Sequence, residues 1–219
     1  MSLTISKLHI EYPGQRVFDS IDLNFEDNEI IAIETHVLDG GTSLLQGIGG
    51  FLNDVGGEVN LNGLDLLHCS PAKRAIRVGY VYEDQGLVSL YNIYQNIVLP
   101  LQFHTDLSDE EINERASEVC MSLNLSEELF TDHPHQLNDV QTRLVNLARG
   151  LIINPELLLI DELEGGMSEA YLHDTMATLR EKQQASPMTI IITTSDDFVM
   201  EKADRAFRIK DHDLAPEQP

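Results

Sequence analysis

The chain has 219 residues, of which 42% are hydrophobic and 23% charged, and this fits one large globular domain with a core of its own. Its 14 basic residues stand against 37 acidic ones, for a formal net charge of −23, which argues against a nucleic-acid partner because such binding needs a basic surface. No apolar run approaches the roughly 18 residues that a membrane span needs, and the first residues lack the pattern of a secretory signal. We therefore expect a cytoplasmic chain that inserts no segment into the membrane.

The first predicted elements along the chain are strands. Residues 3–25 favour a hairpin pair around Pro13 and Gly14, because a Pro-Gly step between apolar segments is typical of a turn. Three later runs are continuously apolar rather than alternating, and such runs predict strands buried on both faces of a parallel sheet. These runs cover residues 30–33, 157–160 and 190–192.

Helical patterns lie between these strands. After Gly41, apolar residues recur at the spacing of one helix face. They are Leu44, Leu45, Ile48, Phe51 and Leu52. Ser108 is followed by three acidic residues, which predicts an N-cap for a helix towards Leu123. A further helix is expected from Asn138 to Ile152, closed by an Asn-Pro pair. Strands and helices in this order predict an α/β protein.

The loop between the first buried strand and its helix is the first candidate site. A loop at a helix N-terminus binds phosphate through backbone amides, and the usual pattern is G-x-x-x-x-G-K-[ST]. Here Thr35 stands at the first glycine, Gly40 at the second, Gly41 at the lysine and Thr42 at the hydroxyl that binds Mg²⁺. This loop alone is too weak a signal to identify a family.

Further motifs resemble those of ATP-binding-cassette (ABC) ATPases, in the same order, from Leu3 to Leu214. Residues 157–162 resemble the Walker B strand, and residues 133–141 stand where the family has its L-S-G-G-Q signature. Residues 78–83 resemble the Q-loop, and residues 92–97 resemble the start of the helix after it. Residues 143–150 resemble the helix that follows the signature, and residues 193–196 resemble the switch region. Tyr12 stands at the position of the aromatic residue that stacks on adenine. Residues 99–107 add a hint of the MCE-associated lipid transporters within the family.

This resemblance implies a P-loop NTPase-like parallel sheet core, an N-terminal antiparallel β subdomain and an inserted helical subdomain. We expect a single domain over 1–219, with its core in 1–86 and 153–219 and its helical part in 87–152. The resemblance gives Glu162 the role of polarising the attacking water, and gives Thr42 and Asp161 that of binding Mg²⁺. The implied nucleotide-binding residues are Tyr12, Gly40, Gly41, Thr42, Ser43, Glu83 and Ser195. The implied cofactors are ATP and Mg²⁺.

Several of these positions depart from the family's pattern. Gly41 supplies no ammonium group, and no Lys or Arg lies between Arg16 and Lys73, while Glu34 and Asp39 add negative charge beside the loop. Because phosphoryl transfer depends on stabilising negative charge, we expect weakened phosphate binding unless a cation arrives from elsewhere in the fold. The candidate cations are Lys73, Arg74, Arg77, Arg143 and Arg149.

Other departures affect the signature and the γ-phosphate contacts. The stretch Asn138-Asp139-Val140 has neither of the signature glycines, which in the family bring backbone close to the γ-phosphate across a dimer interface. Three single replacements accompany this loss. Glu83 replaces the Q-loop glutamine, Ser195 the switch histidine and Ser168 the D-loop aspartate. Together these changes predict that ATP hydrolysis is impaired or absent.

Some interpretations stay open. The retained Asp161–Glu162 pair serves catalysis, or it is structural, with Asp161 capping nearby backbone amides. His133 and His135 flank a proline and suggest a metal site, but no third ligand has a sensible spacing, so loop histidines are the stronger interpretation. Cys69 and Cys120 have no metal or redox spacing, and we expect reduced, buried thiols.

Three functions follow as hypotheses. The first is a degenerate nucleotide-binding-domain subunit, a homodimer or heterodimer, that acts structurally or regulatorily on a membrane permease or on an active ABC ATPase at the inner face of the membrane. The second is a working ABC ATPase with unusual phosphate ligation, contributing one competent half-site to a heterodimer. The third is a soluble adaptor that reuses the fold to bind a protein.

Overall fold

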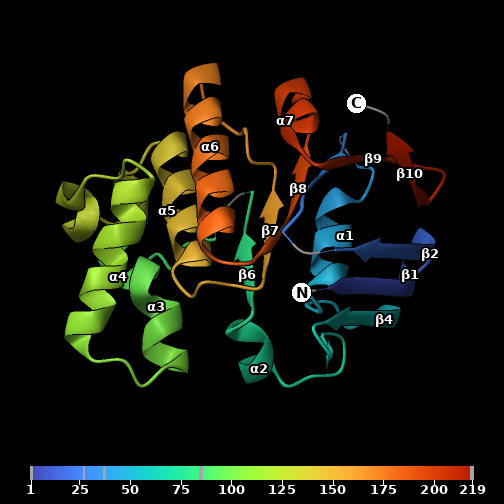
Figure 1. Ribbon diagram of the computed structural model, residues 1–219, viewed down its shortest axis with the longest axis horizontal. Coiled ribbons are helices and arrows are strands. Elements are labelled where there is room, and N and C mark those ends of the chain that lie inside the picture. The colour runs from blue at the N-terminus through green and yellow to red at the C-terminus, as the bar shows by residue number, and fades with distance from the viewer. Residues whose placement is uncertain (1, 27, 37, 84–85, 218–219) are drawn as a thin grey trace.

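The computed structural model describes residues 2–26, 28–36, 38–83 and 86–217, and its strands form two sheets (Figure 1). The smaller sheet is antiparallel, in the order β2-β1-β4-β5. Its strands are β1 (Leu3–Tyr12), β2 (Gln15–Phe25), β4 (Val55–Leu61) and β5 (Leu64–Asp65). β1 and β2 pair with Tyr12 opposite Gln15, so the hairpin predicted around Pro13 and Gly14 is confirmed.

The larger sheet has the order β10-β9-β3-β8-β7-β6. Its strands are β3 (Ile30–Glu34), β6 (Val78–Val81), β7 (Leu157–Asp161), β8 (Thr189–Thr194), β9 (Arg205–Lys210) and β10 (Asp213–Glu217). All neighbours pair in parallel except β10, which runs antiparallel to β9, so the sheet is mixed at that edge. The three apolar runs form β3, β8 and β7, adjacent strands whose residues are almost all buried, as continuous hydrophobicity predicts.

Helices flank this sheet and fill the connection between β6 and β7. That connection contains α3 (Ile93–His104), α4 (Asp109–Ser122), η1 (Glu127–Thr131), η2 (Pro134–Gln136) and α5 (Asp139–Leu151). The other helices are α1 (Gly41–Ile48), α2 (Pro71–Ala75), α6 (Glu169–Ala185) and α7 (Asp197–Lys202). In Figure 1, α3 and α4 lie at one end of the molecule and β1, β2 and β4 at the other. The division into 1–86, 87–152 and 153–219 stays a prediction.

Local sequence sets where the helices begin. Ser108 and Asn138 cap α4 and α5, each through a capping box closed by the residue three positions later, Glu111 or Gln141, so both predicted starts are confirmed. The predicted stripe after Gly41 is wrong at its last two residues. α1 ends at Ile48, because Gly50 adopts φ +70° and the Phe51 amide turns back to donate to the carbonyl oxygen of Gln46 at 2.8 Å. Phe51 and Leu52 therefore lie beyond the helix.

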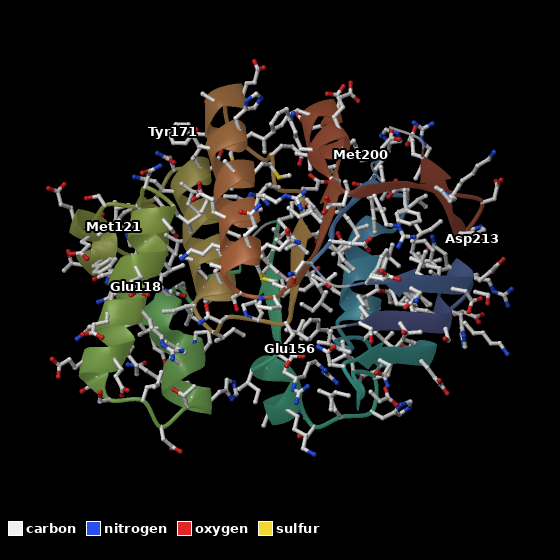
Figure 2. The ribbon with its side chains drawn as sticks, viewed as in Figure 1. Glu118, Met121, Glu156, Tyr171, Met200 and Asp213 are labelled. Carbon is white, nitrogen blue, oxygen red and sulfur yellow. The ribbon has the colours of Figure 1, made fainter. Side chains whose placement is uncertain are left out.

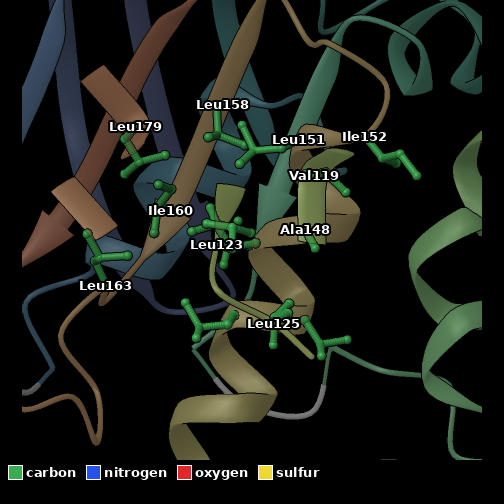
Figure 3. Close-up of a cluster of buried hydrophobic side chains, with 14 of the residues drawn as sticks. Val119, Leu123, Leu125, Ala148, Leu151, Ile152, Leu158, Ile160, Leu163 and Leu179 are labelled. Atoms are coloured by element: carbon green, nitrogen blue, oxygen red, sulfur yellow. The ribbon is translucent and has the colours of Figure 1, made fainter. Parts of the chain in front are cut away.

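Buried side chains fix α5 to the sheet. Val119 of α4, Leu123 directly after that helix, Ala148 and Leu151 of α5, and Leu158 of β7 belong to one cluster (Figure 3). Each buried aliphatic side chain of this kind contributes roughly 1.5–3 kcal/mol. The cluster packs α5 against β7, the strand whose last residue is Asp161.

The cysteines are free, and they differ in burial. Cys120 is buried, and desolvation raises the pKa of its thiol to about 12, while Cys69 is only half-buried. The next residue along α4, Met121, is exposed and lies with Glu118 on the outer side of the helix (Figure 2). A buried, protonated thiol is inert, so the expectation of a buried thiol holds for Cys120 and not for Cys69.

Candidate functional site

The loop between β3 and α1 follows a strand end of the parallel sheet, the edge where ligand sites form in α/β proteins. Gly40 has φ +97°, and a Cβ there would lie 2.5 Å from Val17 Cγ1. Only glycine satisfies both conditions. Gly40 is also the N-cap of α1, and it offers no side chain to cap the helix. The strand–loop–helix arrangement predicted for a phosphate loop is therefore present.

Two amides of this loop are taken by the loop's own carboxylate. The N–H groups of His36 and Gly41 donate to Asp39 Oδ2 and Oδ1, at 2.5 and 3.3 Å. Backbone amides at a helix N-terminus are the groups that a phosphate loop offers to an anion. In this chain the Asp39 carboxylate is the anion that accepts from these two amides.

Gly41 packs directly against Thr35. A Cβ at position 41 would lie 2.6 Å from Thr35 Cγ2 and 3.4 Å from Thr193 Cγ2. Thr35 is only 6% exposed, and its hydroxyl oxygen is buried with no hydrogen-bond partner in the described structure. The two departures from the loop pattern are therefore linked, because threonine at the first glycine position fills the space that a lysine at position 41 would need.

A cavity of about 310 Å³ lies beside this loop. It brings together most of the predicted site, namely Gly40, Gly41, Thr42, Ser43, Glu83, Asp161 and Glu162. Four of its lining residues carry carboxylates, Asp39, Glu83, Asp161 and Glu162, and none of the described lining residues is Lys or Arg. Tyr12 and Ser195 are not among them.

Asp161 is held by hydroxyl groups. Its Oδ1 accepts a hydrogen bond from Thr193 Oγ1 at 3.0 Å, and its Oδ2 accepts one from the Tyr80 hydroxyl at 3.3 Å. The side chain is 2% exposed. The structural interpretation, in which Asp161 caps backbone amides, is wrong in its partners, because neighbouring strands of the sheet supply Thr193 and Tyr80 instead.

Glu162 lies in an acidic environment. Its backbone has φ +50°, and its N–H donates to Thr193 Oγ1 at 3.1 Å. Burial raises the pKa of its carboxyl, and the negative charges of Glu83, Glu164 and Asp161 raise it further, against a smaller opposing effect of Arg143. Three carboxylates and one guanidinium therefore act on this carboxyl, and the carboxylates have the larger effect.

Two predicted residues are engaged by other groups. Ser195 donates to Glu164 through its backbone N–H at 2.7 Å and its hydroxyl at 3.1 Å, and the Thr194 hydroxyl donates to the same carboxylate. Tyr12 shares a hydrogen bond with Ser43, with the two oxygens 3.2 Å apart. The switch segment is thus tied to Glu164, and the tyrosine hydroxyl is tied to the start of α1.

At the position that the resemblance gives to the signature, α5 begins with Asn138 as its N-cap. Asn138 accepts a hydrogen bond from the Gln141 amide at 2.9 Å, and Asp139 opens the first turn of α5. Ser168, at the D-loop position, caps α6 by accepting from the Tyr171 amide. These polar side chains satisfy the ends of their own helices.

The arginines among the candidate cations are engaged by carbonyl oxygens or by a carboxylate, and Arg143 lies close enough to Glu162 to lower the pKa of its carboxyl. Arg143 donates to the carbonyl oxygens of Asp161 and Tyr82, Arg149 to that of Gly86 and Arg74 to that of Leu66. Arg77 pairs with Glu156 at 3.4 Å. None of these residues, nor Lys73, lines the loop cavity in the described structure, so the compensating cation that the sequence left open is not supplied by them.

A second hollow, of about 580 Å³, lies between the sheet and α3. Exposed apolar side chains line it: Phe51, Tyr82, Val88 and Phe103. Tyr80 lines it as well, and its ring packs edge-on against Phe51 with centroids 5.5 Å apart. Since the Tyr80 hydroxyl donates to Asp161, one side chain joins this groove to the loop cavity.

His133 and His135 lie close together before α5. Within the described residues, no group of three or more His, Cys, Asp or Glu side chains is placed to hold a metal ion. The rings of His133 and His135 stack 6.0 Å apart.

Among the helices described, none is both long and apolar enough to cross a membrane.

Sequence reasoning missed Tyr80, Thr193 and Glu164. Tyr80 and Thr193 fell inside quoted motifs, at positions to which the resemblance assigns no role. Glu164 follows Asp161 and Glu162 in a short acidic run, and that run was the signal that could have identified it.

Comparisons with known proteins agree with the family resemblance of the sequence. The model of a family described as ABC transporter matches residues 18–164. The tungstate uptake system ATP-binding protein TupC of Peptoclostridium acidaminophilum is 33% identical over 195 residues, covering 89% of this chain and 87% of that protein. The macrolide export ATP-binding/permease protein MacB of Rhodopirellula baltica is 30% identical over 201 residues, covering 89% of this chain. This chain spans 29% of the length of that MacB protein.

Solved structures confirm the predicted fold class. A dimeric, post-hydrolysis state of the ATP-binding cassette MJ0796, bound to ADP and Pi, has a TM-score of 0.91 at 23% identity, covering 99% of this chain and 98% of that one. CbiO1 of Clostridium perfringens, part of the ABC transporter complex CbiONQ, has a TM-score of 0.82 at 25% identity, covering 97% and 86%. None of these four relatives supports the hint of an MCE-associated subgroup.

Proposed function

Because this chain belongs to the ABC transporter family, we propose that it is a nucleotide-binding-domain subunit with impaired or absent ATP hydrolysis, which acts structurally or regulatorily on a membrane permease. One observation carries this proposal. The cavity beside the loop is lined by four carboxylates and by no Lys or Arg among the described residues. Phosphoryl transfer depends on positioning and on stabilising negative charge, and this lining has the opposite electrostatic character.

The contacts around the loop support the same conclusion. The space for a lysine at position 41 is filled by Thr35, and Asp39 already accepts from two of the loop amides. Charge-assisted hydrogen bonds contribute about 1.5–3 kcal/mol each. The loss of several of them at once lowers phosphate affinity by orders of magnitude.

The residues that would hold Mg²⁺ with ATP fit poorly. Thr42 and Asp161 are the ligands that the family resemblance implies, but both oxygens of Asp161 accept hydrogen bonds from hydroxyl groups. This supports a structural role for Asp161, which ties β7 to β6 and β8.

The permease contact is proposed for the groove lined by Phe51, Tyr82, Val88 and Phe103. Exposed apolar patches of this kind mark protein interfaces. The named relatives include a chain that joins an ATP-binding part to a permease. By analogy with that relative, we place the subunit at the cytoplasmic face of the membrane, as a homodimer or a heterodimer.

A second candidate function is a working ATPase that contributes one competent half-site to a heterodimer. It is favoured by the hydroxyls of Thr42 and Ser43, which line the same cavity as Asp161 and Glu162. Calorimetry with millimolar ATP and Mg²⁺ separates the two. The proposed function predicts neither binding heat nor a rise in melting temperature, whereas saturable binding would favour the half-site.

A further inference from the structure

We propose that the groove between β6 and α3 binds an extended segment of the permease, which pairs with the free edge of β6 as an added strand and carries acidic side chains. This inference rests on the proposed function, which gives the permease contact to the same groove. Proteins commonly bind extended peptides by adding a strand to an open sheet edge. The contact then depends on main-chain hydrogen bonds as well as on apolar side chains.

β6 is the last strand of the large sheet, and among the described strands it pairs only with β7 (Figure 1). The carbonyl oxygen of Arg77, one residue before β6, accepts from the Leu157 amide of β7 at 3.0 Å. Residues of an edge strand bond to the neighbouring strand at every second position. Gly79, two residues after Arg77, therefore faces β7 in the same way. Val78 and Tyr80 direct their N–H and C=O groups away from β7, towards the open edge.

These two outward-facing residues are buried. Val78 is 5% exposed and Tyr80 is 7% exposed, and both line the groove. Outside the ladder with β7, the main chain of neither residue makes a hydrogen bond with another described segment. Buried main-chain N–H and C=O groups are almost always paired in native proteins. Two such residues on one strand edge therefore point to a segment that supplies their partners.

The groove has a wall on each face of β6. On one face the ring of Tyr80 packs against Phe51, with centroids 5.5 Å apart. On the other face Gly79 lies so close to α5 that a Cβ there would lie 2.5 Å from the carbonyl oxygen of Gly150. Both Phe51 and Gly150 line the groove. Because the side chains of a strand alternate between the two faces of a sheet, an added strand places successive side chains against the two walls.

The groove also differs in charge from most of the chain. None of its described lining residues is acidic, while Arg149 and His104 are among them. Arg74 of α2 lies over the Phe51 ring, 5.6 Å from its centroid, and Lys73 is exposed on the same helix. In a chain with 37 acidic and 14 basic residues, this groove is complementary to a segment with acidic side chains.

Hydrogen exchange in the complex with the co-purified permease tests the added strand. The complex is exchanged in heavy water, the chain is released, and its amides are measured one by one by NMR. We expect the amides of Val78 and Tyr80 to exchange at least about tenfold more slowly in the complex than in the free chain, because they gain acceptors. The amides of Gly79 and Val81 are the matched control, since both face β7, and their exchange should not change.

Two results of this experiment overturn the inference. Equal slowing at the control amides would mean that the permease covers β6 without pairing with it, as a docked helix does. The same conclusion follows if the amides of Val78 and Tyr80 do not slow. In either case, loss of the permease with Phe103→Glu leaves the proposed contact standing. If no permease co-purifies with the chain, the proposed contact falls, and the inference falls with it.

The charge of the segment is tested with the permease in nanodiscs of phosphatidylcholine. Lys73→Glu on α2 is compared with Lys7→Glu on β1, which makes the same charge change outside the groove. We expect Lys73→Glu to lower the affinity by about threefold or more and Lys7→Glu to leave it unchanged. Unchanged affinity with Lys73→Glu contradicts an acidic segment. Equal binding of the chain to empty nanodiscs of phosphatidylglycerol assigns the basic residues of α2 to lipid and contradicts it as well.

Discussion

The methyl group of Thr35 occupies the space beside Gly41, where a Cβ would lie 2.6 Å from Thr35 Cγ2. Gly41→Lys should therefore lower the free energy of unfolding by about 1–3 kcal/mol, as overpacking does in a filled site. Thr35→Ser removes that methyl group and should recover part of the loss. Urea denaturation of the two single variants and the double variant measures the coupling.

The matched control for this cycle is Thr175→Ser, which removes a methyl group from a buried threonine of α6. Its effect on the free energy of unfolding should add to that of Gly41→Lys, with no coupling energy between the two substitutions. If Thr35→Ser is equally additive, the two loop positions are independent and the steric account of the missing lysine is wrong.

The buried hydroxyls of Thr35 and Thr193 should respond differently to the same substitution. Thr35→Val replaces a hydroxyl that has no partner in the described structure, so the free energy of unfolding should stay level or rise. Thr193→Val removes contacts to Asp161 and to the Glu162 amide and should lower it by about 1–3 kcal/mol. Chemical denaturation measures the free energy of unfolding of both variants. An equal decrease in the two variants would mean that the Thr35 hydroxyl has a hydrogen-bond partner in solution.

Glu162→Gln should raise the melting temperature at neutral pH. Burial and the charges of Glu83, Glu164 and Asp161 raise the pKa of Glu162 in the folded state. A carboxyl with a raised folded-state pKa stabilises the fold below its unfolded pKa of about 4.3, and this contribution is lost as the pH rises through the folded-state pKa. The rise in melting temperature caused by Glu162→Gln should therefore be full above the folded-state pKa of Glu162 and should vanish below the unfolded-state pKa.

Scanning calorimetry from acid to neutral pH measures this difference, with Glu110→Gln on the exposed side of α4 as the control. The control should show little dependence on pH. A melting temperature of Glu162→Gln that is lower than that of the unmodified chain at neutral pH would mean that Glu162 has a favourable partner.

Phe103→Glu should abolish the contact with a permease. Phe103 is 71% exposed and lines the groove, whereas Met121 is 76% exposed on α4 and does not. Membrane extracts that carry the tagged chain should therefore yield a co-purified permease with Met121→Glu and lose it with Phe103→Glu. Retention of the permease by both variants would place the contact elsewhere, and a soluble protein in its place would favour an adaptor.

Much of the fold could be predicted because it is encoded locally. Continuous apolar runs marked β3, β7 and β8, and the capping residues Ser108 and Asn138 marked the starts of α4 and α5. The end of α1 was missed, although Gly49 and Gly50 follow Ile48 and glycine is favoured just beyond a helix C-terminus. The close approach of Gly50 to the Leu66 carbonyl is a contact between separate segments, and local sequence carries no signal for it.

The site was predicted in its positions and not in its contacts. The motif order placed Gly41, Thr42, Glu83, Asp161 and Glu162 together, and one cavity contains them. The partners of Asp161 come from β6 and β8, on either side of its own strand, and spacing along the chain carries no information about hydroxyls that meet across a sheet. For the same reason the contact between Tyr12 and Ser43 was not foreseen.

Phosphate release from ATP tests the central claim most directly. The purified chain, alone and with its co-purified permease, is assayed with millimolar ATP and Mg²⁺ beside the Glu162→Gln variant prepared in the same way. The acidic lining of the loop cavity predicts that the two release phosphate at the same background rate. Turnover by the unmodified chain that Glu162→Gln abolishes would contradict the account.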